Sequence, residues 1–86
     1  MYKEGKEKMK IKISEFEKSK QFIKVVTNYE SDIFLKSGRF VIDAKSVMGI
    51  FSLDLSKELE VEIIERTEGE KDKLYTQLRE LGIVVE

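Results

Sequence analysis

The chain has 86 residues, with 16 lysines and arginines against 17 aspartates and glutamates, and it contains no cysteine, histidine, proline or tryptophan. These absences exclude disulfides, thiol and imidazole nucleophiles, imidazole bases, and metal sites built from thiolates or imidazoles. The net charge of −1 lacks the basic footprint of a nucleic-acid-binding protein. No apolar run approaches the ~20 residues of a membrane span. No secretory signal opens the chain. The composition predicts a soluble, cytoplasmic protein without a metal or cofactor.

The length fits one small domain. Residues 1–8 are rich in lysine and glutamate, and we expect them to form a flexible or strand-extending arm. Residues 9–86 then form a single domain. Apolar residues alternate with charged ones over residues 9–13, which predicts a first strand with Met9, Ile11 and Ile13 on one face.

A helix is predicted over residues 15–28. Ser14 precedes it and Glu17 follows three residues later, a spacing typical of a capping box. Apolar or small residues then recur at helical spacing along one stripe. The stripe consists of Phe16, Ser19, Phe22, Ile23 and Val26.

Two short alternating runs, 32–36 and 39–44, flank a Ser-Gly pair at 37–38 and predict a β-hairpin. Ser46 precedes a compact apolar stretch, which is typical of an N-capped helix of two turns or fewer. At helical spacing, Ile50 and Leu53 are the better core residues of that stretch.

The remaining residues predict a strand over 59–66 and a helix over 70–81 with Gly82 at its C-cap. The tail Ile83–Val85 is expected to be extended and to pack on the domain edge or against a partner. The element order is therefore βαββαβα. It predicts a two-layer α+β domain with a four-stranded antiparallel sheet and three helices on one face.

Residues 29–35, the Ser-Gly turn and residues 43–53 resemble the HPr family, the phosphocarriers of the bacterial sugar phosphotransferase system. The most specific part is Ala-Lys-Ser-Val-Met-Gly at 44–49, followed two residues later by Ser-Leu. The start of the last helix, at 68–70, fits weakly. The resemblance covers residues 29–64 and implies the open-faced sandwich of that family, whose element order is the same.

The chain departs from the family where HPr proteins carry a Gly-Leu/Ile-His-Ala-Arg-Pro segment. Counting back from Ser46 without gaps places Glu15 at the histidine position and Glu17 at the arginine position. Aligning the first strands instead implies a shortened loop at this point. No histidine is present to accept a phosphoryl group, so the phosphohistidine step is excluded for this chain.

The catabolite-repression HPr-like proteins show a similar pattern, because they lack the histidine and keep the regulatory serine. The resemblance implies a non-enzymatic regulatory or adaptor protein that HPr kinase would phosphorylate at Ser46. Its implied partners are phosphotransferase-system enzymes or a transcriptional regulator such as catabolite control protein A. Val47, Met48 and Phe51 would form the docking patch.

Each of these residues also has a plainer interpretation. Ser46 can serve only as a helix cap, and the apolar residues after it can be core. Glu15 and Glu17 could act as a general acid–base pair, but first-turn acidic residues have a capping explanation. The lysines of the first helix (Lys18, Lys20 and Lys24) are a basic docking face or a solvated one.

A second hypothesis from a different class is an unphosphorylated structural or oligomerisation module. The apolar tail at 83–85 supports it, because an added edge strand could pair with another copy. An RNA-binding α/β domain is disfavoured by the net charge and by the lack of paired aromatic residues.

Overall fold

The computed structural model describes residues 9–51, 54 and 56–85, without the side chains of Val47 and Phe51. The expected arm at 1–8 and the expected core residue Leu53 lie outside the described residues. Eight elements follow in chain order: β1 (Met9–Ile11), α1 (Phe16–Val26), β2 (Asp32–Ser37), β3 (Phe40–Asp43), α2 (Val47–Phe51), β4 (Leu59–Ile64), α3 (Glu70–Leu81) and β5 (Val84–Val85). The predicted elements through residue 82 are confirmed, with ends shifted by a few residues.

The described strands form one antiparallel sheet in the order β3-β2-β4-β1-β5. The prediction of four strands was wrong, because the C-terminal tail forms a fifth. Gly82 ends α3 in a left-handed conformation, with φ of 78°. The chain then turns back, so that Val84 and Val85 pair with Ile11 and Lys10. The element order is therefore βαββαβαβ.

The sheet register brings the alternating apolar residues onto one face. Ile11 lies opposite Leu59, and Leu35 lies opposite Val61. All four side chains are at most 2% exposed. They join one hydrophobic cluster with the buried residues of the three helices, which are Phe22, Val26, Ile50, Leu74 and Leu78. This confirms the predicted inward face of the first strand, and the same alternation places Ile33 and Leu35 of β2 and Leu59 and Val61 of β4 inward.

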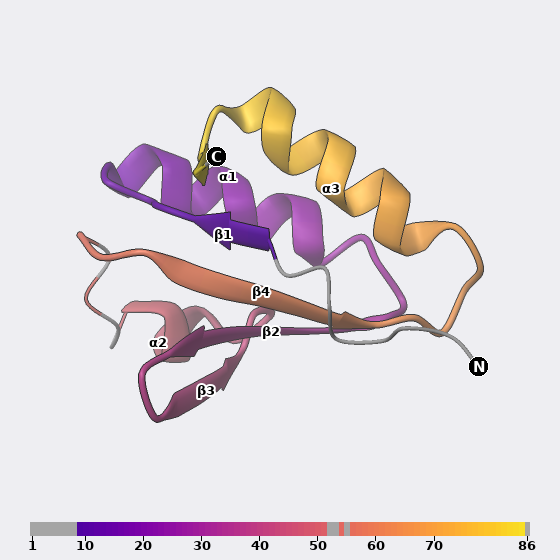
Figure 1. The fold of residues 1–86 in the computed structure, drawn as a ribbon, viewed down its shortest axis with the longest axis horizontal. Helices are drawn as coiled ribbons and strands as arrows, with labels where there is room; N and C mark the ends of the chain where they lie inside the picture. Colours follow the sequence, from indigo (N-terminus) through magenta and orange to yellow (C-terminus); the bar gives the residue numbers. More distant parts are fainter. Residues whose placement is uncertain (1–8, 52–53, 55, 86) are drawn as a thin grey trace.

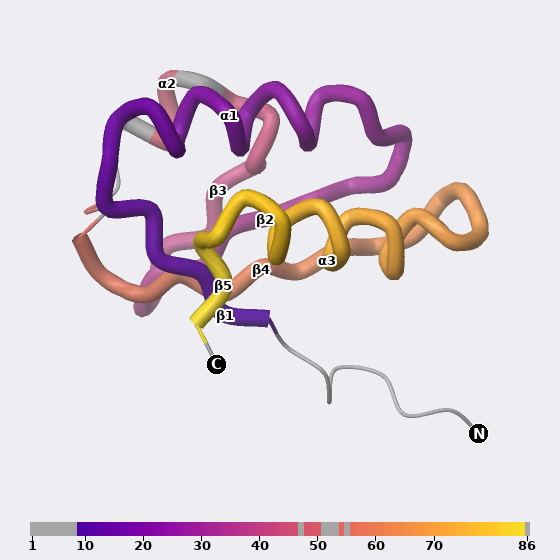
Figure 2. Tube along the Cα trace, turned by 90° about the horizontal axis from the view of Figure 1, so that it is seen from above, coloured from indigo at the N-terminus to yellow at the C-terminus, as the bar shows by residue number. Residues whose placement is uncertain are grey.

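All three helices lie on this buried face of the sheet. Figure 1 shows α1 and α3 running in opposite directions over the strands, and Figure 2 shows the same pair from above. The helix α2 lies over β3: Ile42 is paired with the buried Leu35, and a methyl group built on Gly49 would lie 2.5 Å from Ile42 Cγ2. The domain is thus an open-faced α+β sandwich.

The opposite face of the sheet carries charged residues of both signs. Lys36 Nζ lies 2.9 Å from Glu62 Oε1, and the hydrogen bond to this carboxylate raises the pKa of Lys36. In the described part of the chain, no helix has the length and hydropathy needed to cross a membrane.

The start of α1 differs from the prediction. The helix begins at Phe16 with Glu15 as its N-cap residue, and no side chain caps it. Glu15 is still extended, so Ser14 lies one residue too early to cap the helix, and the predicted capping box was wrong. Phe16 is 60% exposed rather than buried, because the buried stripe begins only at Ser19.

The hairpin turn follows the predicted chemistry. The two turn residues between β2 and β3 are Gly38 and Arg39. Gly38 has a φ of 60°, the positive value that a type II′ turn requires at its first central position. The hairpin was predicted with Ser37 and Gly38 as the turn pair, so the turn lies one residue later than predicted, with Ser37 in β2 opposite Phe40.

The close approach of α2 to β3 predicts that Gly49→Ala destabilises the protein. Alanine favours a helix by up to ~1 kcal/mol over glycine, but the added methyl group would overlap the stiff, β-branched Ile42. Overpacking of this kind costs about 1–3 kcal/mol, so we expect a net loss of about 1 kcal/mol in the free energy of unfolding, measured with urea. In a double-mutant cycle, Ile42→Ala should relieve part of that loss. A more stable Gly49→Ala variant would contradict this packing.

Candidate functional site

Ser46 lies between β3 and α2, and its side chain is exposed. Its Oγ accepts a hydrogen bond from the Gly49 backbone N–H at 3.2 Å. Its carbonyl oxygen accepts one from the Ile50 N–H at 3.0 Å. This is the geometry of an N-cap residue, and it confirms the predicted capping role of Ser46.

Residues 43–46, which we call the serine segment, are held by several hydrogen bonds to the backbone. The Ala44 N–H donates to the Ile33 carbonyl at 2.8 Å, and Ala44 is fully buried. Asp43 accepts two bonds, from the Lys45 N–H at Oδ1 (2.9 Å) and from the Ser46 N–H at its carbonyl (2.9 Å). The loop therefore closes on Asp43 as an Asx turn, and the position of Ser46 is set by bonds that do not involve its own hydroxyl.

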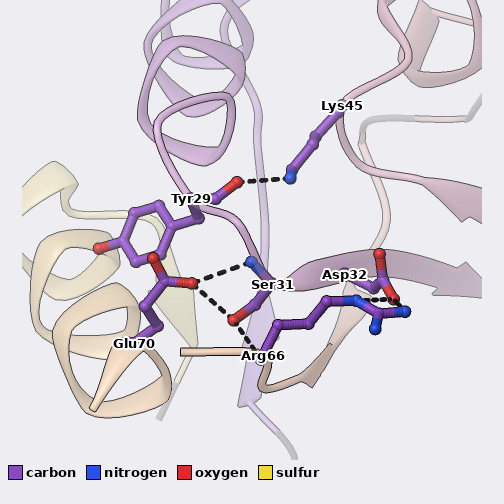
Figure 3. A network of polar contacts seen from close by, with 6 residues as sticks. All are labelled: Tyr29, Ser31, Asp32, Lys45, Arg66 and Glu70. Atoms are coloured by element: carbon purple, nitrogen blue, oxygen red, sulfur yellow. Dashed lines mark hydrogen bonds and ion pairs between the residues drawn. The ribbon is translucent and has the colours of Figure 1, made fainter. Parts of the chain in front are cut away.

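Lys45 connects the serine segment to the loop between α1 and β2. Its Nζ donates to the Tyr29 carbonyl at 2.5 Å (Figure 3). The Tyr29 ring is 5% exposed, and its hydroxyl donates to Gln77 Oε1 on α3. Burial, and secondarily the charge of Glu70, raise the pKa of Tyr29. Lys45 is thus engaged in a tertiary contact.

The same loop is attached to α3 by Glu70. Glu70 Oε1 accepts the Ser31 N–H at 2.9 Å and the Ser31 hydroxyl at 2.6 Å (Figure 3). Its Oε2 accepts the Glu30 N–H at 3.3 Å. The Ser31 hydroxyl oxygen also accepts the Arg66 N–H at 2.9 Å, and Ser31 is fully buried. These bonds, first of all that from the Ser31 hydroxyl, lower the pKa of Glu70.

Charged side chains at the ends of β2 and β4 complete this network. The Arg66 guanidinium donates to Asp32 Oδ2 through Nε at 2.9 Å and through a terminal nitrogen at 2.5 Å, which raises the pKa of Arg66. Glu65 Oε2 accepts the backbone N–H groups of Gly69 and Lys71, at 3.1 and 2.8 Å. It therefore caps α3, whose N-cap residue is a glycine with no side chain.

Of the predicted docking patch, the described structure resolves one side chain. Met48 is 80% exposed on α2, whereas the side chains of Val47 and Phe51 are outside the described residues. Phe16, at the start of α1, is a further exposed apolar residue. Both views place α2 and the start of α1 at the same end of the molecule (Figures 1 and 2).

The acidic and basic residues of α1 do not form a separate site. Glu15 is exposed, and Glu17 forms an ion pair with Lys20 at 3.3 Å. Lys18 Nζ donates to the Leu81 carbonyl at 2.6 Å, at the C-terminus of α3, where a cation is favourable. Lys18 and Lys20 thus have structural partners. The described residues contain no group of histidine, cysteine, aspartate and glutamate side chains that could hold a metal ion.

The contacts of Lys45 and Glu70 were not predicted from the sequence. An aspartate two residues before Lys45 is a local signal for the Asx turn. No such signal exists for the bonds between Glu70 and Ser31, which are 39 residues apart. Only a three-dimensional arrangement of the loop and α3 brings them together.

Comparison with known proteins identifies the family. A family model described as "PTS HPr component phosphorylation site" matches residues 16–81. The HPr-like protein Crh of Bacillus subtilis (strain 168) is 36% identical over 53 residues. That match covers 62% of this chain and 62% of the relative. No solved structure matches the chain significantly.

The chain therefore belongs to the HPr family of the phosphotransferase system. Within that family it resembles the catabolite-repression HPr-like proteins. Members of the family are phosphocarrier and regulatory proteins rather than enzymes. The matched range begins at Phe16, immediately after Glu15, and includes Ser46.

The cap bond predicts that Ser46→Ala lowers the free energy of unfolding by about 1 kcal/mol, because the Gly49 N–H loses its acceptor. Ser46→Asp is the matched control, since aspartate is an equally good N-cap and should retain most of the stability. Urea unfolding of the three proteins measures the difference. Equal stability of the alanine variant and the wild type would show that the cap contributes nothing.

Proposed function

We propose that this HPr-family chain is a non-catalytic regulatory or adaptor protein of the cytoplasm, unable to carry phosphohistidine and switched by phosphorylation at Ser46. The observation that carries the proposal is an exposed serine, already at a helix N-terminus, in an HPr-family sequence without histidine. Glu15, the residue nearest to the missing histidine by ungapped counting, is an exposed carboxylate and cannot form a phosphohistidine.

The local geometry is compatible with a phosphoryl group on Ser46. A kinase would join Ser46 Oγ to the γ-phosphorus of ATP, releasing ADP and the hydroxyl proton. The product adds nearly two negative charges at the start of α2, where backbone N–H groups favour an anion. The serine segment is held through Asp43, Ala44 and Lys45, so its backbone need not move. The modification would change the charge of a preformed surface.

The surface next to Ser46 would bind a protein partner through Val47, Met48 and Phe51. Met48 supports this role, because an exposed methionine is apolar and adapts to different partners. Family resemblance points to HPr kinase, to phosphotransferase-system enzymes or to a transcriptional regulator as the partners. The added negative charge would then favour partners whose binding surface is positively charged and disfavour partners whose surface is negatively charged.

The alternative is an unphosphorylated oligomerisation module that uses the tail at 83–85. The position of β5 at the edge of the sheet is the observation in its favour. However, the tail already has a role within the chain: Ile83 is 4% exposed, and its carbonyl accepts the Lys12 N–H at 2.8 Å. The proposal based on Ser46 therefore has the stronger support.

Phosphorylation at Ser46 predicts that the wild type gains one phosphoryl group from ATP and HPr kinase, as measured by intact mass. Ser46→Ala should gain none. Ser52→Ala is the matched control, because it removes a different serine close to Ser46 in the sequence and should still be modified. An ordinary HPr with its regulatory serine confirms that the kinase is active. If the wild type stays unmodified while the ordinary HPr is phosphorylated, Ser46 acts only as a helix cap and the proposed switch is wrong.

A further inference from the structure

The strand β3 is an edge strand with an exposed apolar surface. Among the described strands it pairs only with β2, and it lies at the outside of the sheet (Figure 1). Three of its four residues are exposed, among them Phe40 at 68% and Val41 at 58%. Natural edge strands commonly carry lysine or proline, which discourage pairing with another strand. β3 contains neither, and its one charged residue, Asp43, lies at its C-terminal end, so Phe40, Val41 and Ile42 form an uncharged stretch of edge.

The hydrogen-bond pattern shows which groups of β3 face outward. The Ala44 N–H donates to the Ile33 carbonyl, so this pair is of the hydrogen-bonded type. In an antiparallel ladder the hydrogen-bonded pairs alternate with open ones. Ile42, two residues earlier, therefore directs its backbone groups toward Leu35 on β2. Val41 and Asp43 direct theirs away from the sheet. The Asp43 carbonyl already accepts the Ser46 N–H, so a further strand would pair mainly through the two backbone groups of Val41.

We propose that β3 pairs with β3 of a second copy of this chain, antiparallel, about a two-fold axis that passes beside Val41. In this register Val41 lies opposite the partner's Val41, and the outward backbone groups of the two residues form reciprocal hydrogen bonds. The two five-stranded sheets then join into one continuous sheet. The interaction is isologous, as expected for a two-fold dimer.

Charge complementarity selects this register. Two residues on either side of Val41, Arg39 would lie opposite the partner's Asp43, and by symmetry the pair occurs twice. Within the described residues, Arg39 has no ion-pair partner. Asp43 uses Oδ1 for the Lys45 N–H, and Oδ2 remains for a guanidinium. A slip by two residues would place Asp43 opposite the partner's Val41 and lose both ion pairs.

The apolar residues fit the same register. Phe40 would lie opposite the partner's Ile42, on the face of the sheet that the helices cover. Ile42 is half-buried under α2 in the single chain. This contact would cover the part of the Ile42 side chain that α2 leaves exposed. A one-residue slip would place Val41 opposite the partner's Ile42. This would put the apolar residues of one strand on the opposite face from those of the other.

The contact uses neither Ser46 nor the tail, so it goes beyond the proposed function and its test is independent of the kinase. The interface is small, and interfaces below ~1,200 Å² in total are usually weak. We therefore expect dimers at roughly 0.1–1 mM protein, detected by sedimentation equilibrium.

Val41→Lys should weaken this dimer at least tenfold, because two lysines would meet at the two-fold axis. The matched control is Ile64→Lys. Ile64 is similarly exposed, at 51%, on the same open face, but it belongs to the inner strand β4. That control should dimerise like the wild type. Circular dichroism verifies that both variants are folded.

A cysteine variant tests the register directly, because the chain has no native cysteine. Val41→Cys should form a disulfide-linked dimer on mild oxidation, since opposite residues in such a pair have Cα atoms about 5.5 Å apart. Ile64→Cys should give far less. A wild type that is monomeric at about 1 mM, a dimer that Val41→Lys leaves unchanged, or equal cross-linking of the two cysteine variants would overturn the proposal.

Discussion

The contact between Glu70 and Ser31 positions much of the rest of the structure. One buried hydroxyl group joins three segments, since it donates to the first turn of α3 and accepts from the backbone just after β4, while its own residue immediately precedes β2. This junction lies next to the β2–β4 pair, whose register buries Ile33 and Leu35. Because the carboxylate accepts bonds from Glu30 and Ser31, the contact also fixes the loop that leaves α1.

The same loop carries the Tyr29 carbonyl to which Lys45 donates, so this loop connects the serine segment to the Glu70 contact. Asp43 and Ala44 hold the segment from its own side. Ser46 can therefore remain exposed as a helix cap without a loss of order around it. Under the proposed function, a phosphoryl group placed there would change the charge of a surface whose backbone is already held by hydrogen bonds. Loss of the histidine need not disturb this arrangement, because the described contacts of the serine segment involve no residue of the α1 N-terminus.

Most of the fold could be predicted from the sequence, because its elements have local causes. Alternation predicts the inward faces of β1, β2 and β4, glycine with positive φ marks the hairpin turn and the end of α3, and Ser46 marks the start of α2.

The errors have equally definite causes. The strand β5 is only two residues long and gains its backbone partners from β1, which lies more than 70 residues away in the sequence. The Ser14–Glu17 spacing matched a capping box, but the extended backbone of Glu15 delays the helix by one residue. The Glu70 network is wholly tertiary and has no pattern in the sequence.

The most direct test of this account is an NMR titration of the Glu70 side-chain carboxyl group. The hydrogen bonds from Ser31 and Glu30 favour the ionised form, so we predict a pKa below the usual ~4.3 of glutamate, with the Ser31 amide shifting at the same midpoint. A lowered folded-state pKa means that the contact stabilises the fold fully above the unfolded-state pKa, and that this stability is lost as pH falls through the folded-state value. A Glu70 carboxyl that titrates at or above the usual value, with no response at Ser31, would contradict the central role given to this contact.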